Sequence, residues 1–352
     1  MNYHSKIINV LLSPIALLYG AITTVRNKLY DWGIIKSYSP TPPCIVVGNL
    51  NTGGTGKSPM VEYLIELLLT HHKQVTAISR GYGRVTKGFR EVQLTDTATN
   101  VGDEPLQFKH LFNKQCTVIV DEKRAHALQQ LQSTETKATV YVLDDALQHR
   151  SVKGSTNILL TAYNDLFVND AMLPVGNLRE NKNGYERANI IVVTKCPANI
   201  TAIDKNIISK RIQLLPHQSI FFSSILYANL VSVTDANNTI ELTKTTAIIS
   251  FSGIANDTPF VNYLQEKANL LQHISFADHH NFTTIDIDKI ITIIAQNNIH
   301  NPVIITTHKD GMRLLQLQAD FITKIQLYYL PTKMYFSPNE QQQFNQLILQ
   351  QC

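Results

Sequence analysis

Short apolar runs rich in β-branched residues alternate along the chain with longer stretches in which apolar residues recur at helical spacing. Up to residue 218, these runs predict strands at Ile45–Val47, Gln74–Ser79, Thr117–Val120, Val140–Leu143, Asn157–Thr161 and Ile190–Thr194. The stretch at about Met60–Thr70 predicts a helix. Strands that are apolar throughout are typical of parallel sheets covered on both faces. We therefore expect an α/β fold with a parallel sheet flanked by helices.

The pattern changes after residue 218, where the runs become shorter and alternate. Runs at Phe221–Leu226, Leu230–Thr234 and Thr239–Leu242, with an Asn-rich turn at 235–238, predict a β-ribbon that joins two lobes. A second α/β unit follows, with strands at Ala247–Phe251, His273–Phe276 and Val303–Thr306 and helices at Thr258–Ala268 and Asp286–Gln296. We expect an N-terminal helix at 1–30, a core at 31–218, a ribbon linker at 219–245 and a smaller α/β lobe at 246–352.

The N-terminal apolar stretch Ile7–Ala21 is interrupted by polar residues and a proline, and is bounded by Lys6, Arg26 and Lys28. It is short for a spanning helix, and it lacks the small-residue cleavage site of a signal peptide. We expect a membrane-associated helix that lies in the interface, with the basic residues facing anionic headgroups. A helix packed on the domain is the alternative, and the pattern does not decide between lying flat and spanning.

Composition narrows the class of protein further. With 352 residues, the chain is long enough for about two domains. The net charge of +4 comes without a dense block of Lys and Arg, which argues against a nucleic-acid partner. The four cysteines are scattered without a close pair, which favours a reducing compartment and neither a disulfide framework nor a zinc site.

A glycine-rich turn between the first predicted strand and the first helix of the core is typical of a phosphate loop. Its glycines allow consecutive N–H groups to surround a phosphate, and the following helix presents its positive end to the same anion. Lys57 would reach the β- and γ-phosphates, and the Ser58 hydroxyl would coordinate Mg²⁺. We expect ATP to bind Gly53, Gly54, Thr55, Gly56, Lys57, Ser58 and Pro59. The full pattern has glycine where this chain has Asn51.

Pairs of acidic residues stand at points where phosphoryl transfer would use them. Asp103 and Glu104 precede a proline, which is typical of a helix start, but one carboxylate can also accept a proton while the other holds Mg²⁺. Asp144 and Asp145 end a predicted core strand, where a metal-organising acid follows a phosphate loop. Asp144 is the favoured metal ligand, and Asp145 and the nearby His149 are weaker candidates.

Three other stretches carry candidate chemistry. The turn Arg80–Arg84 combines two glycines with two arginines and is suited to an anion. The pair Arg179 and Glu180 follows a Pro/Gly loop and is unremarkable alone. Phe276–Phe282 holds an acid and two histidines, and a histidine that tunes a catalytic carboxylate is favoured over a metal site. Lys309 is equally consistent with a nucleotide contact and a surface residue.

Together these motifs resemble the tetraacyldisaccharide 4′-kinase family, the lipid A 4′-kinases of Gram-negative bacteria. Six matching motifs occur in the family's order over nearly the whole chain: Val47–Leu50 with Gly53–Pro59, Ser79–Gly83, Gly102–Pro105, Asp144–Asp145 with Gln148–His149, Leu173–Gly176 with Leu178–Glu180, and Asp278–His279. The chain departs from the family where Ala146 and Leu147 replace an expected Gly-Phe, and where His308 replaces a Glu.

The resemblance implies a two-lobed P-loop NTPase-type fold with the active site between the lobes. It implies an ATP- and Mg²⁺-dependent kinase that phosphorylates the 4′-hydroxyl of a tetraacyldisaccharide 1-phosphate, giving lipid IVA. The enzyme would be peripheral or monotopic at the cytoplasmic face of the bacterial inner membrane, without an obligate protein partner.

The resemblance also implies roles for individual residues. Asp103 would be the general base, assisted by His279, and Lys57 would serve the phosphates. Mg²⁺ would be held by Ser58, Glu104 and Asp144, and substrate or transition-state charge would be supported by Arg80, Asp145, His149, Arg179 and Glu180. The alternative is a P-loop ATPase switch that acts on a protein or metal partner.

Overall fold

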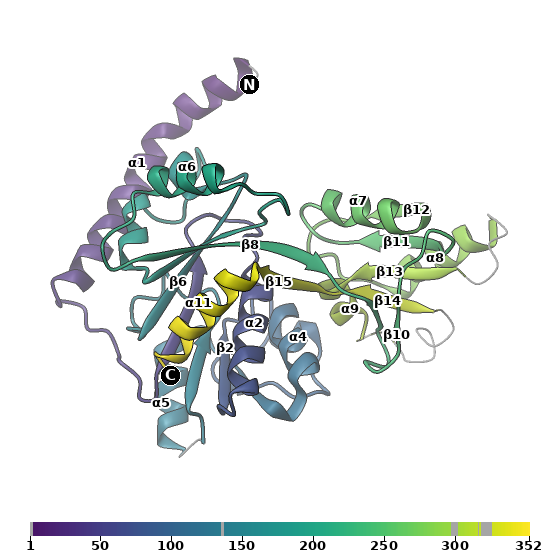
Figure 1. The fold of residues 1–352 in the computed structure, drawn as a ribbon, viewed down its shortest axis with the longest axis horizontal. Coiled ribbons are helices and arrows are strands. Elements are labelled where there is room, and N and C mark those ends of the chain that lie inside the picture. Colours follow the sequence, from purple (N-terminus) through teal and green to yellow (C-terminus); the bar gives the residue numbers. More distant parts are fainter. Residues whose placement is uncertain (1–2, 135–136, 297–301, 316, 318–325) are drawn as a thin grey trace.

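The large lobe of the protein is built on a nine-stranded sheet, seen in a computed structural model that describes residues 3–134, 137–296, 302–315, 317 and 326–352 (Figure 1). The strand order is β15-β8-β7-β6-β1-β5-β2-β4-β3. The strands from β8 to β4 in this order are parallel, whereas β15 and β3 pair antiparallel at the edges. Their bounds are β1 Cys44–Asn49, β2 Val75–Ser79, β3 Arg90–Glu91, β4 Cys116–Val120, β5 Val140–Leu143, β6 Thr156–Ala162, β7 Ile190–Thr194, β8 Ser219–Tyr227 and β15 Thr332–Phe336.

Helices cover both faces of this sheet, as expected from strands that are apolar throughout. Successive side chains of a strand point to opposite faces. Ile45 and Val47 therefore pack in the cluster under α2, α4 and α11, whereas Val46 packs on the opposite face with α5. The helices of this lobe are α1 Tyr3–Asp31, α2 Lys57–Thr70, α3 Ala98–Val101, α4 Asp103–Phe112, α5 Arg124–Ser133, α6 Ala202–Ile212 and α11 Pro338–Leu349, with short 3₁₀ turns at Asn113–Gln115, Phe167–Asn169 and Lys182–Arg187.

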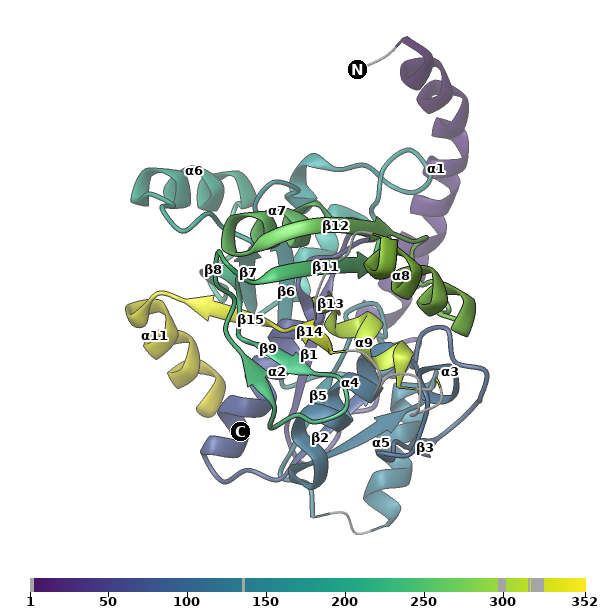
Figure 2. The same ribbon diagram turned by 90° about the vertical axis from the view of Figure 1, so that its right-hand side faces the viewer.

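The smaller lobe is built on a six-stranded sheet with the order β10-β9-β14-β13-β11-β12 (Figure 2). Its strands are β9 Leu230–Ser232, β10 Thr239–Ile240, β11 Ala247–Ser252, β12 Asn269–Ser275, β13 Val303–Thr307 and β14 Leu327–Leu330, and its helices are α7 Thr258–Lys267, α8 Thr284–Gln296 and α9 His308–Leu314. The four strands from β14 to β12 are parallel, so their carboxyl ends lie at one edge. That edge delivers α9 to the large lobe, where it packs against α4.

Two neighbouring strands connect the lobes, and this corrects our expected boundaries. We expected a linker at 219–245, but β8 belongs to the large sheet and the hairpin β9–β10 to the small one. We also expected residues 246–352 to form the smaller lobe, but β15 returns to pair with β8 and α11 packs on the large sheet. The return is stabilised by Phe336, Phe344 and Ile348, which are buried against the large lobe.

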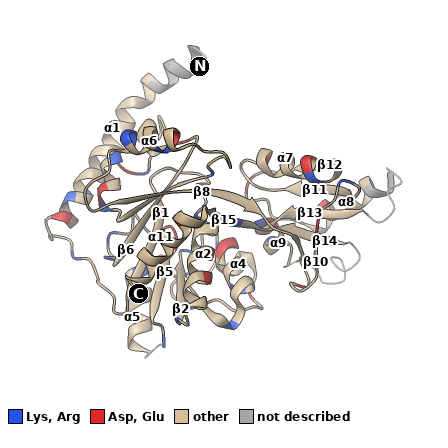
Figure 3. Ribbon diagram, viewed as in Figure 1, with Lys and Arg blue, Asp and Glu red and all other residues tan. Residues whose placement is uncertain are grey.

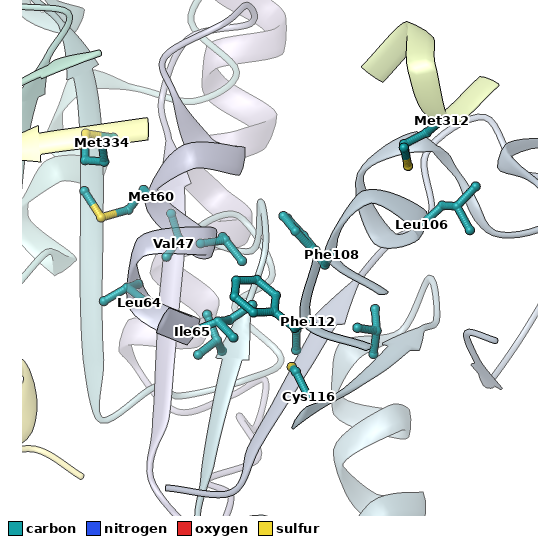
Figure 4. Close-up of a cluster of buried hydrophobic side chains, with 14 of the residues drawn as sticks. Val47, Met60, Leu64, Ile65, Leu106, Phe108, Phe112, Cys116, Met312 and Met334 are labelled. Atoms are coloured by element: carbon teal, nitrogen blue, oxygen red, sulfur yellow. The ribbon is translucent and has the colours of Figure 1, made fainter. Parts of the chain in front are cut away.

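The main hydrophobic core continues from the large lobe into α9. Figure 4 shows Met60, Leu64 and Ile65 of α2 beside Phe108 and Phe112 of α4. Nearer the start of α4, Leu106 lies next to Met312 of α9. Because this apolar contact is buried, it fixes the position of α9 against α4, whose first residues are Asp103 and Glu104.

The N-terminal helix α1 is longer than the expected apolar segment and packs along the large lobe. Ala16 and Thr23 are buried against the lobe, and the Tyr19 hydroxyl donates a hydrogen bond to the Arg179 carbonyl at 2.8 Å. Residues 10–31 are long and apolar enough to span a membrane by length and composition, a test that core helices and signal sequences also pass. From residue 10 onward the helix carries no charged residue before Arg26, and Figure 3 shows charged residues near its carboxyl end.

Candidate active site

A cavity of about 850 Å³ lies where the carboxyl ends of β1, β2 and β5 meet α1 and the smaller lobe. Most of the side chains expected to carry chemistry line this cavity, although they are distant in sequence. They are Lys57, Arg80, Asp103, Glu104, Asp144, Asp145, His149, Arg179 and His279. The remaining wall includes Tyr19, Ile22, Thr23, Arg26 and Tyr30 of α1, together with Arg124, Arg150 and Lys309.

The glycine-rich turn has the backbone of a phosphate loop. Gly53 and Gly56 have φ angles of 116° and 85°, which favour glycine. Helix α2 begins at Lys57, whose Nζ lies 3.3 Å from Asn49 Oδ1 and 3.9 Å from Asp145 Oδ1. An amine held between polar groups at a helix N-terminus is suited to phosphate.

Asn51, the departure from the phosphate-loop pattern, has a structural partner here. Its side-chain amide donates to Asp170 Oδ2 at 2.8 Å, and its backbone forms a bridge with Leu178. The asparagine therefore ties the start of the loop to residues 170–178, so glycine is not required at this position.

Glu104 links the phosphate loop to the smaller lobe. The Ser58 hydroxyl and the Lys309 ammonium both donate to Glu104 Oε1 at 2.6 Å. Burial acts to raise the pKa of Glu104, but Lys309 and the Ser58 hydrogen bond hold it at about 2. This carboxylate is therefore ionised and lies beside the hydroxyl that follows Lys57.

Asp144 is a buried carboxylate with one oxygen directed at no protein partner. Ser79 donates to its Oδ2 at 3.0 Å, whereas Oδ1 is buried without a hydrogen bond among the described residues. Burial, and then the charges of Glu104 and Asp145, raise the pKa of Asp144 to about 7. Adjacent carboxylates with one unsatisfied oxygen form a site that a divalent cation would stabilise.

Asp103, the first residue of α4, meets residues from the smaller lobe. His279 Nδ1 lies 3.3 Å from Asp103 Oδ2, and Arg313 Nε donates to the same oxygen at 2.9 Å. His279 adopts a φ of 57° in the loop after β12, and its ring lies 5.6 Å from that of Tyr82. The expected acid and histidine are thus brought together across the two lobes.

Asp145 and Arg179 form a two-point ion pair beside Lys57. Arg179 Nη1 and Nη2 donate to the two carboxylate oxygens of Asp145 at 2.9 and 2.8 Å. Burial acts to raise the pKa of Asp145, but the Arg179 hydrogen bond and the charge of Lys57 hold it below its usual range. The pair places a fixed guanidinium at the end of the cavity near Lys57.

Glu180 differs from its neighbour because it lies outside the cavity lining. Its buried carboxylate accepts from Asn27 at 2.7 Å, Gln148 at 2.9 Å and Arg187 at 2.7 Å. Glu180 therefore ties α1 to the loop that carries His149. It supports the site and does not line the cavity.

His149 lines the cavity as a neutral side chain. Burial, and then the charges of Arg124 and Arg80, lower the pKa of its imidazole to about 4.

Comparisons with known proteins agree with this geometry. A family profile described as Tetraacyldisaccharide-1-P 4′-kinase matches residues 8–352. The chain is 42% identical to the tetraacyldisaccharide 4′-kinase of Bacteroides thetaiotaomicron, covering 99% of this chain and 94% of that protein. It is 43% identical to that of Flavobacterium johnsoniae, covering 98% and 97%. This chain belongs to the tetraacyldisaccharide 4′-kinase family.

The solved structures agree with the family assignment. The apo form of LpxK from Aquifex aeolicus in complex with ATP has a TM-score of 0.76 and 26% identity, covering 98% of this chain and 99% of that chain. As a tetraacyldisaccharide 4′-kinase family member, the protein is a kinase with a P-loop kinase fold. Both the recognition of the family and the expected fold class are confirmed.

Two departures from the family pattern have a visible structural setting. Leu147 packs directly on Gly48, where an added Cβ would approach the Leu147 Cβ to 2.6 Å. His308 is buried and stacks on Tyr329, with ring centroids 4.1 Å apart and planes 8° apart. Both residues belong to the packing beneath the site, and neither lines the cavity.

Sequence reasoning missed several basic residues of this kinase. Arg124 is fully buried and donates to the Asp144 carbonyl at 3.2 Å, while Arg313 contacts Asp103 from the other lobe. Arg150 donates to the Asn27 carbonyl and to Asp31, both at 2.7 Å, and so fastens α1 beside the cavity. No motif marks these positions, because their partners are set by tertiary structure.

Proposed function

We propose that this protein transfers the γ-phosphate of ATP to the 4′-hydroxyl of a tetraacyldisaccharide 1-phosphate, giving lipid IVA in lipid A biosynthesis. The single observation that carries this proposal is a shared cavity: Lys57 at the phosphate loop and Asp103 at the start of α4 both line it. A nucleotide and an acceptor hydroxyl can therefore meet between an amine and a carboxylate. The names of the matched family and relatives supply the acceptor class.

In the proposed reaction, Asp103 takes the proton from the 4′-hydroxyl as its oxygen forms a bond to the γ-phosphorus. The bond between that phosphorus and the β–γ bridging oxygen breaks, and ADP leaves. Asp103 is suited to this role because it lines the cavity and is held by His279 and Arg313 of the smaller lobe. His279 assists by fixing the carboxylate. Positioned bases of this kind contribute about 10²–10⁴-fold to a rate.

The phosphates are held by the turn Gly53–Pro59, with Lys57 at the β- and γ-phosphates. Arg179, fixed by Asp145, lies where charge develops on the transferring group, and Arg80 and His149 line the same wall. Glu180 supports this wall indirectly through its bonds to α1 and Gln148.

Ser58, Glu104 and Asp144 would hold Mg²⁺. The unpaired Oδ1 of Asp144 and the Ser58 hydroxyl are the hard oxygen donors that this ion prefers. Among the described residues, no group of three or more His, Cys, Asp or Glu forms a metal cage. Mg²⁺ keeps waters and uses substrate phosphates as further ligands. When bound, the ion neutralises charge on the β- and γ-phosphates.

The acceptor carries acyl chains, and α1 is suited to meet it at a membrane surface. The outer face of this helix exposes Val10, Leu11, Ile15, Leu17, Leu18, Ile22 and Val25. Ala16, Tyr19 and Asn27 dock the helix to the large lobe, whereas these apolar side chains remain exposed and can enter lipid. We therefore propose a monotopic helix at the cytoplasmic face of the inner membrane.

The experiment that tests the proposal follows radiolabelled γ-phosphate from ATP onto purified disaccharide 1-phosphate in detergent with Mg²⁺. A labelled lipid that requires Lys57 supports the kinase. Asp103→Ala should lower kcat by about 10²–10⁴-fold with ATP binding retained, because it removes a transition-state interaction. Asp288→Ala, an exposed carboxylate of α8, is the matched control and should leave kcat unchanged. Wild-type turnover by Asp103→Ala would refute its role as base.

The alternative, a P-loop ATPase switch that acts on a protein or metal partner, predicts a different outcome of the same assay. It would release free phosphate at a useful rate without lipid and without a labelled lipid product. Such a switch would not need the contact between Asp103 of the large lobe and His279 of the smaller lobe. This contact therefore favours the kinase.

A further inference from the structure

Arg313 of α9 is a buried cation for which the proposed reaction has no role so far. Its side chain is 3% exposed. Buried arginines need partners for their charge and for five N–H donors. Nε donates to Asp103 Oδ2 at 2.9 Å, and Nη2 contacts the same oxygen and, at 3.0 Å, His279 Nδ1. Nη1 donates to Asp310 Oδ1 at 2.7 Å and to the Gly253 carbonyl at 2.9 Å. All five donors are engaged.

The groups around Arg313 come from three adjacent parallel strands of the smaller lobe. Gly253 follows β11, His279 lies in the loop after β12, and Asp310 and Arg313 belong to the helix after β13. Parallel strands bring their carboxyl ends to the same edge, so the smaller lobe builds this pocket for the guanidinium by itself. Asp310 is fixed in turn by Thr307 Oγ1 at 2.6 Å and by the Gly253 N–H at 2.9 Å.

Asp103 is the one partner of Arg313 that comes from the large lobe. Arg313 and His279 both approach Oδ2 of its carboxylate. Neither contact uses the other oxygen, Oδ1, and Asp103 lines the cavity. A guanidinium keeps its proton in proteins, and two donors from one planar group hold the position of this carboxylate oxygen.

His279 lies against the same ion pair. Its Nδ1 is 3.0 Å from Arg313 Nη2 and 3.3 Å from Asp103 Oδ2. The imidazole therefore contacts both members of the pair that joins the two lobes.

We propose that Arg313 is the positioning residue for the general base: it holds Asp103 Oδ2 from the opposite lobe and leaves Oδ1 to take the proton of the acceptor hydroxyl. This inference rests on the proposed role of Asp103. It makes lobe closure part of catalysis, because the base is oriented only when α9 is seated on α4. Misplacing a reacting group by about 1 Å can cost about 10²-fold in rate.

The test measures kcat, both KM values and thermal unfolding of full-length variants in detergent. Arg313→Ala should lower kcat by about 10²-fold while both KM values stay close to wild type, since a transition-state geometry is lost and not substrate binding. Millimolar guanidinium should restore part of kcat by entering the vacated pocket. Arg90→Ala, which removes another arginine paired with an aspartate, is the control and should show neither the loss nor the rescue.

A double-mutant cycle distinguishes positioning from general support of the fold. Arg313→Ala added to Asp103→Ala should cost little more than Asp103→Ala alone. Additive losses, or a loss of stability without guanidinium rescue, would overturn the proposal. If Arg313→Ala does not fold, Asp310→Asn loosens the same guanidinium with the shape of the pocket kept, and it should lower kcat less but in the same non-additive way.

The outcomes also separate this inference from the proposed function. An inactive Asp103→Ala protein together with wild-type kcat in Arg313→Ala would overturn only the positioning role. Wild-type kcat in Asp103→Ala would overturn the base itself, and with it the inference that depends on it.

Discussion

At the scale of single residues, the site is a set of carboxylates whose ionisation is fixed by the partners that the fold supplies. Glu104 is ionised beside Lys309, whereas Asp144 has its pKa raised to about 7 by burial and like charges. The two acids therefore have different pKa values although both line one cavity. A cation between them would remove the difference, because it would favour the ionised form of both.

Glu62, one turn beyond the phosphate loop on α2, should make stability depend on pH. Burial, and then the charge of Glu104, raise its pKa to about 8, against an ordinary value of 4.5. The folded state therefore retains a proton that the unfolded chain loses. The contribution of Glu62 to stability should be greatest below pH 4.5 and should fall by a few kcal/mol, on the order of the shift, as the pH rises to about 8.

Glu62→Gln should remove this slope and stabilise the protein at pH 8, because the amide keeps the shape and the hydrogen bond from Gln107. Urea unfolding between pH 5 and pH 8 measures the effect. Glu66→Gln, an exposed position on the same helix, is the matched control and should leave the slope as in the wild type. A Glu62→Gln protein with the wild-type slope would contradict the pKa assignment.

Some residues of the site belong to a local sequence motif, whereas others are brought there only by tertiary structure. Lys57 and Ser58 could be predicted because a phosphate loop is local: strand, turn and helix are contiguous in sequence. Arg313 could not, because its partner Asp103 lies 210 positions away in the other lobe. A sequence pattern identifies residues that lie in one local motif. A contact between lobes can be predicted only when the relative positions of the two sheets are known.

At the scale of elements, buried strands were the most predictable part of the fold. Val140–Leu143 and Ile190–Thr194 have their expected bounds, since runs of β-branched residues between polar turns have few other solutions. Helix α11 and strand β15 were missed for a physical reason. The sequence of α11 is rich in glutamine and buries little beyond Phe344 and Ile348, and Pro331 interrupts the run that contains β14 and β15.

Helix α1 should lose its membrane affinity when its exposed face becomes charged. Leu11 and Leu18 are 70% and 64% exposed and lie two turns apart on that face. Leu11→Glu combined with Leu18→Glu should release the protein from membranes and raise the KM for lipid more than the KM for ATP. Thermal stability should change little, because exposed sites contribute within about 0.5 kcal/mol.

Fractionation of the variant with liposomes measures the loss of binding. Ile285→Glu is the matched control, since that side chain is 76% exposed on α8 of the smaller lobe. If the fraction of the α1 variant bound to liposomes is the same as for the wild type, the proposal of an interfacial helix is wrong. Equal losses in the variant and the control would point to a general effect of added charge.

At the scale of the whole molecule, the two lobes are coupled by two kinds of connection. Strands β8 and β15 of the large sheet are paired where the chain passes to and from the smaller lobe, with Tyr227 opposite Thr332. In addition, α9 meets α4 through the contacts of Arg313 and Lys309 with Asp103 and Glu104. The lobes therefore cannot separate fully without breaking these ion pairs next to the proposed base.

The end of the chain should contribute directly to the stability of the large lobe. Phe344 of α11 is fully buried and lies 4.8 Å from Phe336 and 5.3 Å from Phe221, measured between ring centroids. Phe344→Ala should cost about 3–5 kcal/mol, since it leaves a cavity in this aromatic cluster. Urea unfolding measures the loss. Gln342→Ala on the same helix is the control, and equal stability of the two variants would contradict this role of α11.

The return of β15 and α11 to the large sheet also sets an order of events during synthesis. The phosphate loop and its strand leave the ribosome early, but the edge strand and the helix that complete their lobe are translated after the smaller lobe. At about 5–20 residues per second, a nascent chain spends roughly 15–65 s with α1 made and the large lobe still unfinished. Helix α1 can therefore reach a membrane before the kinase is complete, and the enzyme would acquire its catalytic lobe already at the surface where its substrate lies.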